Sequence, residues 1–300
     1  KVLCRSSSKR GTKVEAYIQV LTNGVMLGAL YACIAVGFSL VWGVLNIINM
    51  MHGSMIILGG YLTYFAWLHL KINPLFMLLI VPPLLFLLGY GLQFVMINRV
   101  IARPVLTTLT LTFGLDMILY NLMNVVFEAT PRRITMDIGS VSFFDVVLPG
   151  DRLMAMLLAL ALTGILYWVM RTSRTGRAIV AVRMDRDAAA LMGIPINRVY
   201  AVTFAISAMM AGACGVLMAV TFPVTTNISG LLLGKAFAVC VLGGLGSVPG
   251  ALIGGLALGL IESLSGNWWG PQNAVLTGSV LMIILLMTRP TGLLGKAGYE

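Results

Sequence analysis

The sequence predicts an all-α, polytopic integral membrane protein with about eight membrane segments, two of them broken or re-entrant. Of the 300 residues, 59% are hydrophobic and only 10% are charged, against roughly 25% charged in a typical soluble domain. Several apolar stretches run for about twenty residues, the length that crosses a hydrocarbon layer of roughly 30 Å. These runs are apolar all round and do not alternate, which favours helices over the strands of a closed barrel.

The apolar runs form one membrane domain, for which we expect bounds of 16–288. The ends are basic: we expect a cytoplasmic N-terminal segment at 1–15 and a cytoplasmic tail at 289–300. Residues 128–152 read as a small exposed loop, because they mix both charges with Pro, Gly and β-branched residues. The runs are 16–36, 37–70 with a polar break, 75–97, 105–127, 153–170, 199–221, 232–264 with a glycine-rich break, and 274–288.

The basic residues predict the orientation of the chain. The net charge of +10 does not indicate a nucleic-acid partner, because Lys and Arg lie between apolar runs, as in proteins that use them to mark the cytoplasmic side. Segment 171–198 carries six arginines and is placed in the cytoplasm, with 128–152 outside. The N-terminus is cytoplasmic if the first broken run enters and returns. It is external if 16–45 forms one long span. We prefer the first arrangement.

Several chemistries are not indicated. The cysteines Cys4, Cys33, Cys214 and Cys240 form no CxxC pair or His/Cys cluster, so we predict neither a disulfide framework nor a metal site. A phosphate-cradling loop needs GxxxxGK[ST] after a strand, and no segment has that spacing. No Ser/His/Asp order or paired carboxylates mark an enzyme. We therefore predict no catalytic residues and no cofactor, and expect any ATPase to be another chain.

Two apolar runs are interrupted by polar or glycine-rich residues. Non-helical backbone at membrane depth persists only where it is buried in protein or faces a water-filled cavity, and broken helices expose ends that receive polar groups. The alternatives are an ordinary interfacial turn for the first break and close helix packing by glycines for the second. The spans around the two breaks differ in order, so we claim no internal repeat. The candidate path residues are Asn46, Asn49, His52 and Gly53, and Gly243, Gly244, Gly246, Ser247 and Gly250.

Two carboxylates lie in apolar runs and are further candidates for the translocation path. An acid within the membrane is costly to bury and is a functional candidate by default. Asp116 lies in the middle of its run, where a structural partner is the alternative. Glu262 lies near the predicted external end of its run, where reaching water is the alternative.

Segment 171–198 contains a short predicted helix with an apolar tip. Asp185 and Asp187 suit a helix N-terminus, the alanines that follow favour helix, and Gly193 is the residue type favoured just past a helix end. Such a helix suits docking into a groove on a cytoplasmic partner. The alternative is a solvated loop whose arginines set topology or contact anionic lipid. The predicted docking residues are Arg183, Asp187, Ala190, Leu191, Met192, Gly193 and Ile194.

Four ordered blocks carry a resemblance to a known family. They are NGVMLGALYACIAVGFSLVWGVLNIINMMHG, RTSRTGRAIVAVRMDRDAAALMGIPINRVYAVTFAISAMMAGACGVL, VLGGLGSVPGALIGGLALGLIE and the closing RPTGLLG. Over about residues 23–295 the chain resembles the shorter type of membrane permease subunit in bacterial branched-chain amino-acid ABC importers. It departs from the family's N-F-A-H-G at one place, where Met50 and Met51 stand between Asn49 and His52.

The resemblance implies a subunit of an ATP-driven importer in the bacterial inner membrane. It implies three kinds of protein partner: a second, longer permease paralogue, two cytoplasmic ATP-binding subunits and a periplasmic substrate-binding protein. The stretch AAALMGI is similar to the family's coupling segment, which contacts the ATPase. Branched-chain or related small amino acids are the expected substrates, while similar permeases carry urea, short amides or aromatic acids.

The rival hypothesis is a stand-alone secondary transporter driven by an ion gradient. In that protein Asp116, Glu262 and His52 would be the coupling residues. A passive channel is a third possibility. The sparse intramembrane charge argues against ion coupling, and the docking-like helix argues against both.

Overall fold

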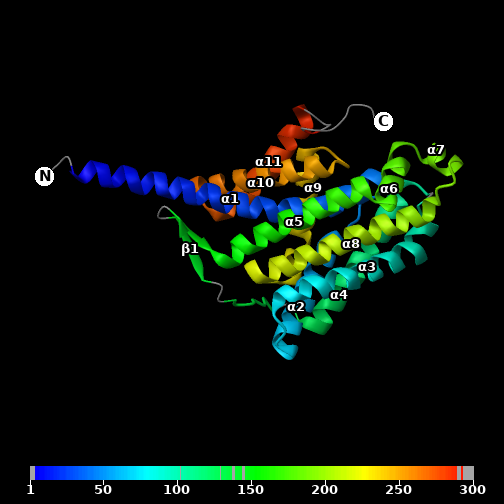
Figure 1. Ribbon diagram of the computed structural model, residues 1–300, viewed down its shortest axis with the longest axis horizontal. Coiled ribbons are helices and arrows are strands. Elements are labelled where there is room, and N and C mark those ends of the chain that lie inside the picture. Colours follow the sequence, from blue (N-terminus) through cyan, green and yellow to red (C-terminus); the bar gives the residue numbers. More distant parts are fainter. Residues whose placement is uncertain are drawn as a thin grey trace.

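The computed structural model describes residues 4–288, apart from 102, 129, 137–138 and 144–145, together with Gly292. It is an elongated helical bundle with a two-stranded antiparallel hairpin at one end and the short helix α7 at the other (Figure 1). We call these the hairpin end (residues 140–149) and the α7 end (residues 186–191). The elements are α1 (Cys4–Leu45), α2 (His52–Leu70), η1 (Pro74–Phe76), α3 (Met77–Val95), η2 (Ile97–Arg99), α4 (Val105–Phe127), β1 (Ser140–Phe143), β2 (Val146–Pro149), α5 (Gly150–Thr172), α6 (Arg174–Met184), α7 (Arg186–Leu191), α8 (Ile196–Thr221), η3 (Thr226–Ile228), α9 (Ser229–Gly243), α10 (Val248–Trp269) and α11 (Pro271–Thr288).

The prediction of an α-helical membrane protein is confirmed. Seven helices among the described residues are long and apolar enough to cross a membrane, and α2 and α11 add two further apolar helices of 19 and 18 residues. The hairpin lies within the segment 128–152 that we expected to be a simple loop. The seven are Tyr17–Leu45, Pro74–Arg99, Val105–Phe127, Gly150–Thr172, Ile196–Thr221, Thr226–Gly243 and Val248–Trp269.

Helix α1 corrects the predicted course of the N-terminal run. We expected that run to enter and return, but α1 is one continuous helix. Near its start, the Gln19 amide bonds both the N–H and the carbonyl of Val147 in the hairpin, at 3.1 and 2.9 Å. Near its end, Gly43 packs against Gly246, which in turn contacts Arg183 of α6. The N-terminal segment and the loop 128–152, which we expected on opposite sides, therefore lie at the same end. Nothing in 16–45 breaks a helix, and the polar break begins only at Asn46.

After α1 the chain turns back into the bundle. The ring Nε2 of His52, the first residue of α2, lies 2.9 Å from the carbonyl oxygen of Ile34. Ile34 lies eleven residues before Leu45, the last residue of α1. With a rise of 1.5 Å for each residue, the segment 46–51 therefore brings the chain back by about 16 Å along the axis of α1. Asn46 makes the reversal with a φ of 54°, a value that Asn tolerates better than most residues. Helix α2 therefore begins inside the bundle.

A second turn back follows α8. Residues 222–228 leave α8, pair with the loop through the Arg132–Val224 bridge, and pass through η3. Helix α9 then begins at Ser229, whose carbonyl oxygen lies directly against Gly53 of α2. The N-termini of α2 and α9 thus meet within the bundle. From there α2 runs towards the loop at 128–132, and α9 runs to the α7 end.

These two turns reveal an inverted repeat. Helices α1, α2 and α3 correspond to α8, α9 and α10 with each helix reversed in direction. The packing is reciprocal as well: Gly89 of α3 lies against Ala208 of α8, and Gly255 of α10 lies against Ala32 of α1. We claimed no internal repeat from the sequence because we compared the breaks at 46–54 and 243–250, whereas the counterpart of the first break is 222–228. Inverted repeats of this kind are common in transporters.

Candidate functional site

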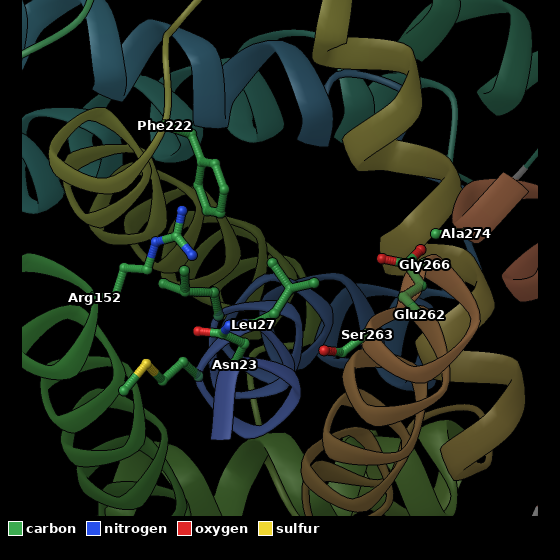
Figure 2. Close-up of a pocket in the computed structure, with 10 residues that line it drawn as sticks. Asn23, Leu27, Arg152, Phe222, Glu262, Ser263, Gly266 and Ala274 are labelled. Carbon is green, nitrogen blue, oxygen red and sulfur yellow. The ribbon is translucent and has the colours of Figure 1, made fainter. Parts of the chain in front are cut away.

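A pocket of about 240 Å³ lies near the hairpin end, lined by α1, the start of α5, the residue after α8, α10 and α11. Its volume is below the roughly 300–1,000 Å³ of pockets that hold drug-sized ligands, so it fits a small molecule. Figure 2 shows Arg152 and Glu262 on opposite walls, with Asn23 and Leu27 of α1 between them. Its lining includes Asn23, Leu27, Arg152, Phe222, Glu262 and Ser263.

Arg152 supplies an uncompensated positive charge to this pocket. It stands in the first turn of α5, and its guanidinium lies 5.8 Å from the centroid of the Phe222 ring. Among the described residues the two ion pairs are Arg132–Glu128 and Lys235–Glu262, so Arg152 has no carboxylate partner. A guanidinium free of such a partner is suited to a planar, bidentate carboxylate.

Glu262 is buried and paired, contrary to the alternative that it reaches water. Its side chain is only 6% exposed, and its Oε2 accepts hydrogen bonds from the Tyr31 hydroxyl at 2.6 Å and from the Lys235 ammonium at 2.9 Å. Lys235 also donates to the Tyr31 hydroxyl and lies 4.4 Å from the centroid of that ring. Buried charges persist when they are paired and hydrogen-bonded, and this pair ties α9, α10 and α1 together.

The first break gathers polar groups inside the bundle. His52 and Ser54 are fully buried, and the Ser54 hydroxyl donates to the Asp116 carboxylate at 2.5 Å. Asn49 accepts a hydrogen bond from the N–H of Met51 at 3.2 Å, while its buried Nδ2 has no partner among the described residues. Asp116 therefore has the structural partner that we named as its alternative.

The second break lies at the α7 end and is made mainly of backbone. Gly243 and Gly250 pack directly on each other, and Ser247 caps α10 by accepting from the N–H of Gly250 at 3.1 Å. Gly244 and Gly246 have φ values of 99° and 78°, a region that favours glycine. Gly246 packs against Gly43 near the end of α1. Their place along a translocation path stays a prediction.

The three residues proposed for ion coupling do not form one cluster. His52 bonds α1, Asp116 bonds Ser54 on α2, and Glu262 bonds Lys235 and Tyr31. Within the described ranges, no group of three His, Cys, Asp or Glu residues is placed to hold a metal ion.

The predicted docking helix is present as α7. Asp185 caps it by accepting from the N–H groups of Asp187 and Ala188, both at 2.9 Å. The apolar tip is solvent-exposed: Leu191 is 89% and Met192 is 83% exposed. The helix ends before Gly193, whose φ is 79°. Ala190 lies exposed beside the tip, the N–H of Ile194 bonds back to Ala189 at 3.1 Å, and Arg183 precedes the helix on α6.

Sequence reasoning singled out Glu262 but missed the residues around it. Lys235 lies in the apolar run 232–264 and Arg152 in the loop 128–152, and neither was among the candidate residues. The signal was available for Lys235, because two opposite charges in neighbouring apolar runs suggest a buried pair. No comparable signal marked Asn23 or Ser263, because polar residues of these types are common near the ends of membrane helices.

Comparison with known proteins agrees with this architecture. The family model of the branched-chain amino acid transport system permease component matches residues 20–288. The chain is 32% identical to the high-affinity branched-chain amino acid transport system permease protein BraD of Pseudomonas aeruginosa, over 96% of this chain and 99% of that protein. It is 33% identical to LivH of Escherichia coli, which has the same description, over 95% and 97%. The fold also resembles PsaBC from Streptococcus pneumoniae, with a TM-score of 0.53, 12% identity and coverage of 91% and 92%.

Proposed function

The chain belongs to the family of permease components of branched-chain amino acid transport systems, and on that premise we propose how it imports its substrate. It is a multi-pass protein of the bacterial inner membrane and a permease subunit, with a role in transport rather than catalysis. We propose that its substrates are branched-chain amino acids, as the names of its relatives state for those proteins.

The proposed assembly contains four further subunits. This chain would pair with a second permease paralogue to enclose the path, and two cytoplasmic ATP-binding subunits would drive it. A periplasmic binding protein would deliver the substrate. The need for a separate ATPase follows from the sequence, which lacks a phosphate-cradling loop. Transporters with inverted repeats commonly work by alternating access, in which one repeat moves against the other. The inverted repeat of this chain fits that mechanism.

We place the α7 end in the cytoplasm. The connecting segments at that end, 98–104 and 171–198, carry eight Lys and Arg residues, whereas the connecting segments at the hairpin end carry four, Lys71, Arg132, Arg133 and Arg152. The N-terminal segment 1–15 adds five at the hairpin end, so the excess at the α7 end holds for the connections between membrane helices. Such an excess marks the cytoplasmic side. The hairpin and the start of α1 then lie outside. A cysteine introduced at Thr175 is expected to react with a membrane-impermeant thiol reagent only from the cytoplasm, and one at Gly139 only from the outside.

The exposed tip of α7 carries the proposal of ATPase coupling. Leu191 and Met192 present two large apolar side chains to solvent at the end of a capped helix. Neither packs on this chain, and an arginine-rich segment surrounds them. An apolar knob on a short helix is a recurrent way to engage a groove on a partner.

The test is co-purification of the ATPase subunits with the Met192→Asp variant. In a dry groove the new carboxylate would be buried without a partner, which costs several kcal/mol, on the order of 3–5. We expect the variant to insert normally and to lose its ATPase subunits. Met184→Asp is the matched control, because Met184 is 72% exposed on the preceding helix. Retention of the ATPase subunits by Met192→Asp, with substrate-stimulated hydrolysis intact, would leave α7 as a solvated segment.

A further inference from the structure

We infer that the hairpin-end pocket binds the zwitterionic head group of an amino acid, with the carboxylate on Arg152 and the ammonium between Glu262 and Asn23. This inference rests on the proposed function and adds a substrate site within this subunit. The site comprises Asn23, Leu27, Arg152, Phe222, Glu262 and Ser263.

The positive wall recognises a carboxylate. Arg152 has no acidic partner among the described residues, and its guanidinium points into the pocket beside Phe222 (Figure 2). The neighbouring charges of Lys235 and Glu262 compensate each other. The pocket therefore carries one net positive charge, which favours an anionic group next to Arg152.

The opposite wall recognises an ammonium. The Oε2 atom of Glu262 already accepts from Tyr31 and Lys235, while Oε1 accepts from no described residue. An ionised carboxylate has about four acceptor positions, so Oε1 remains available. The Oδ1 atom of Asn23 is buried and has no donor among the described residues. A buried acceptor without a donor is costly, and an ammonium with three N–H groups would satisfy both oxygens.

The remaining walls suit a small apolar side chain. Leu27 and the ring of Phe222 line the pocket, and its volume of about 240 Å³ limits the ligand to a few heavy atoms beyond the head group. Ser263 donates its hydroxyl hydrogen to the carbonyl of Val20 at 2.6 Å and keeps its lone pairs for the ligand. A guanidinium without an acidic partner faces available carboxylate and amide oxygens across apolar surface, which matches an amino acid better than a lipid chain or a simple anion.

The pocket also connects the ligand to the helices that reach the α7 end. Glu262 joins α10 to Lys235 on α9 and to Tyr31 on α1. Helix α9 runs from its contact with α2 to the second break, which touches Arg183 on the segment before α7. A ligand that engages Glu262 therefore contacts the same elements that reach the α7 end.

The experiment measures ligand binding to the assembled permease complex in lipid nanodiscs, without the binding protein. Three probes are compared: L-leucine, leucinamide, which lacks the carboxylate, and 4-methylpentanoate, which lacks the ammonium. Arg152→Gln should weaken leucine binding by about tenfold or more, the usual effect of one lost charge-assisted contact, and should leave leucinamide binding unchanged. Asn23→Val should weaken leucine and leucinamide binding but not 4-methylpentanoate binding. The Arg152→Lys variant should bind leucine with an affinity between that of the Arg152→Gln variant and that of the native complex.

The matched control is Arg133→Gln, which removes an exposed arginine at the same end and should bind leucine as the native complex does. The proposal is overturned if Arg152→Gln weakens all three probes equally, if it has no effect, or if Arg133→Gln has the same effect. Equal binding of all three probes by the native complex would also overturn it. ATP-driven leucine uptake by the native importer is measured in parallel. If the native importer takes up leucine but the variants bind leucine as the native complex does, only the pocket proposal is refuted. If the native importer takes up no leucine, the proposed function itself is refuted.

Discussion

Residues 46–51 and 243–250 both separate two helices, but they lie at different depths and carry different groups. The first turn brings the chain back about 16 Å into the bundle, and it delivers buried His52, Ser54 and Asn49 to the interior. The second turn lies at the α7 end and consists of glycine backbone with one capping serine. A turn inside the bundle must satisfy its polar groups within the protein, whereas a turn at the end needs only tight backbone and a cap.

The difference in depth assigns the two turns different roles. The first turn locks α2 against α9 and is part of the fixed core, because Gly53 and Ser229 leave no space between the two helices. The second turn touches Gly43 and Arg183, so it joins the core to the segment that leads to α7. We therefore expect substitutions at the first turn to affect folding, and substitutions at the second turn to affect transport.

Gly53→Ala is expected to have the largest effect. The added methyl group would collide with the carbonyl oxygen of Ser229, and a backbone atom cannot move aside as a flexible side chain can. The variant should yield little monodisperse protein when detergent-solubilised membranes are analysed by size-exclusion chromatography. The control is Gly164→Ala on α5, where the added methyl group meets open space and should stabilise the helix by about 0.5–1 kcal/mol. Normal yield of Gly53→Ala would show that the first turn is not part of the fixed core.

Gly246→Leu is expected to have the next largest effect. A leucine at a φ of 78° is strained by roughly 1–2 kcal/mol, and its Cβ would lie 3.0 Å from the Cα of Gly43 and 3.2 Å from the Arg183 guanidinium. We expect an assembled complex whose ATP-driven uptake falls close to background. Uptake at the native rate with full expression would show that Gly246 is not needed for transport and serves helix packing alone. Loss of assembly would show that the second turn belongs to the fixed core like the first.

Much of this organisation could be predicted from the sequence. Long apolar runs are a local property, so the membrane helices and their approximate limits follow from composition. The docking helix follows from its cap, its alanines and Gly193, which act within a few residues of one another. The positions of the polar breaks were visible for the same reason, but their depth was not, because depth depends on which helices pack around them.

The features that depend on contacts between residues far apart in the chain could not be predicted from the sequence. The pocket combines Asn23, Arg152 and Glu262 from three helices that are far apart in the chain. In the sequence, the turn at 222–228 looks like an ordinary surface loop, because proline and polar residues such as those around Pro223 occur in both kinds of segment. Only the contact between Ser229 and Gly53 shows that it returns the chain to the interior. The continuity of α1 was not predicted, because the polar break that begins at Asn46 suggested a chain that turns back early. The apolar run before Asn46 contains no residue that breaks a helix.

Ser247→Ala is expected to have the smallest effect and sharpens the comparison of the two turns. The substitution removes the hydrogen bond from the N–H of Gly250, and α2 has no equivalent side-chain cap. We expect a loss of about 1 kcal/mol, seen as a drop of a few degrees in the Tm of the solubilised complex. Ser247→Thr keeps the cap and should restore the native Tm. An equal drop in both variants would mean that the hydroxyl does not cap α10.

The most direct test of the account is substrate accumulation by the complete importer in proteoliposomes. The permease pair and its ATP-binding subunits are reconstituted, the binding protein is supplied outside, and labelled leucine, isoleucine and valine are offered with or without ATP in the lumen. No ion gradient is applied in the first arm, and a proton or sodium gradient replaces ATP in the second. The account predicts accumulation only with luminal ATP and the binding protein. Accumulation driven by an ion gradient without ATP would contradict it and identify a secondary transporter.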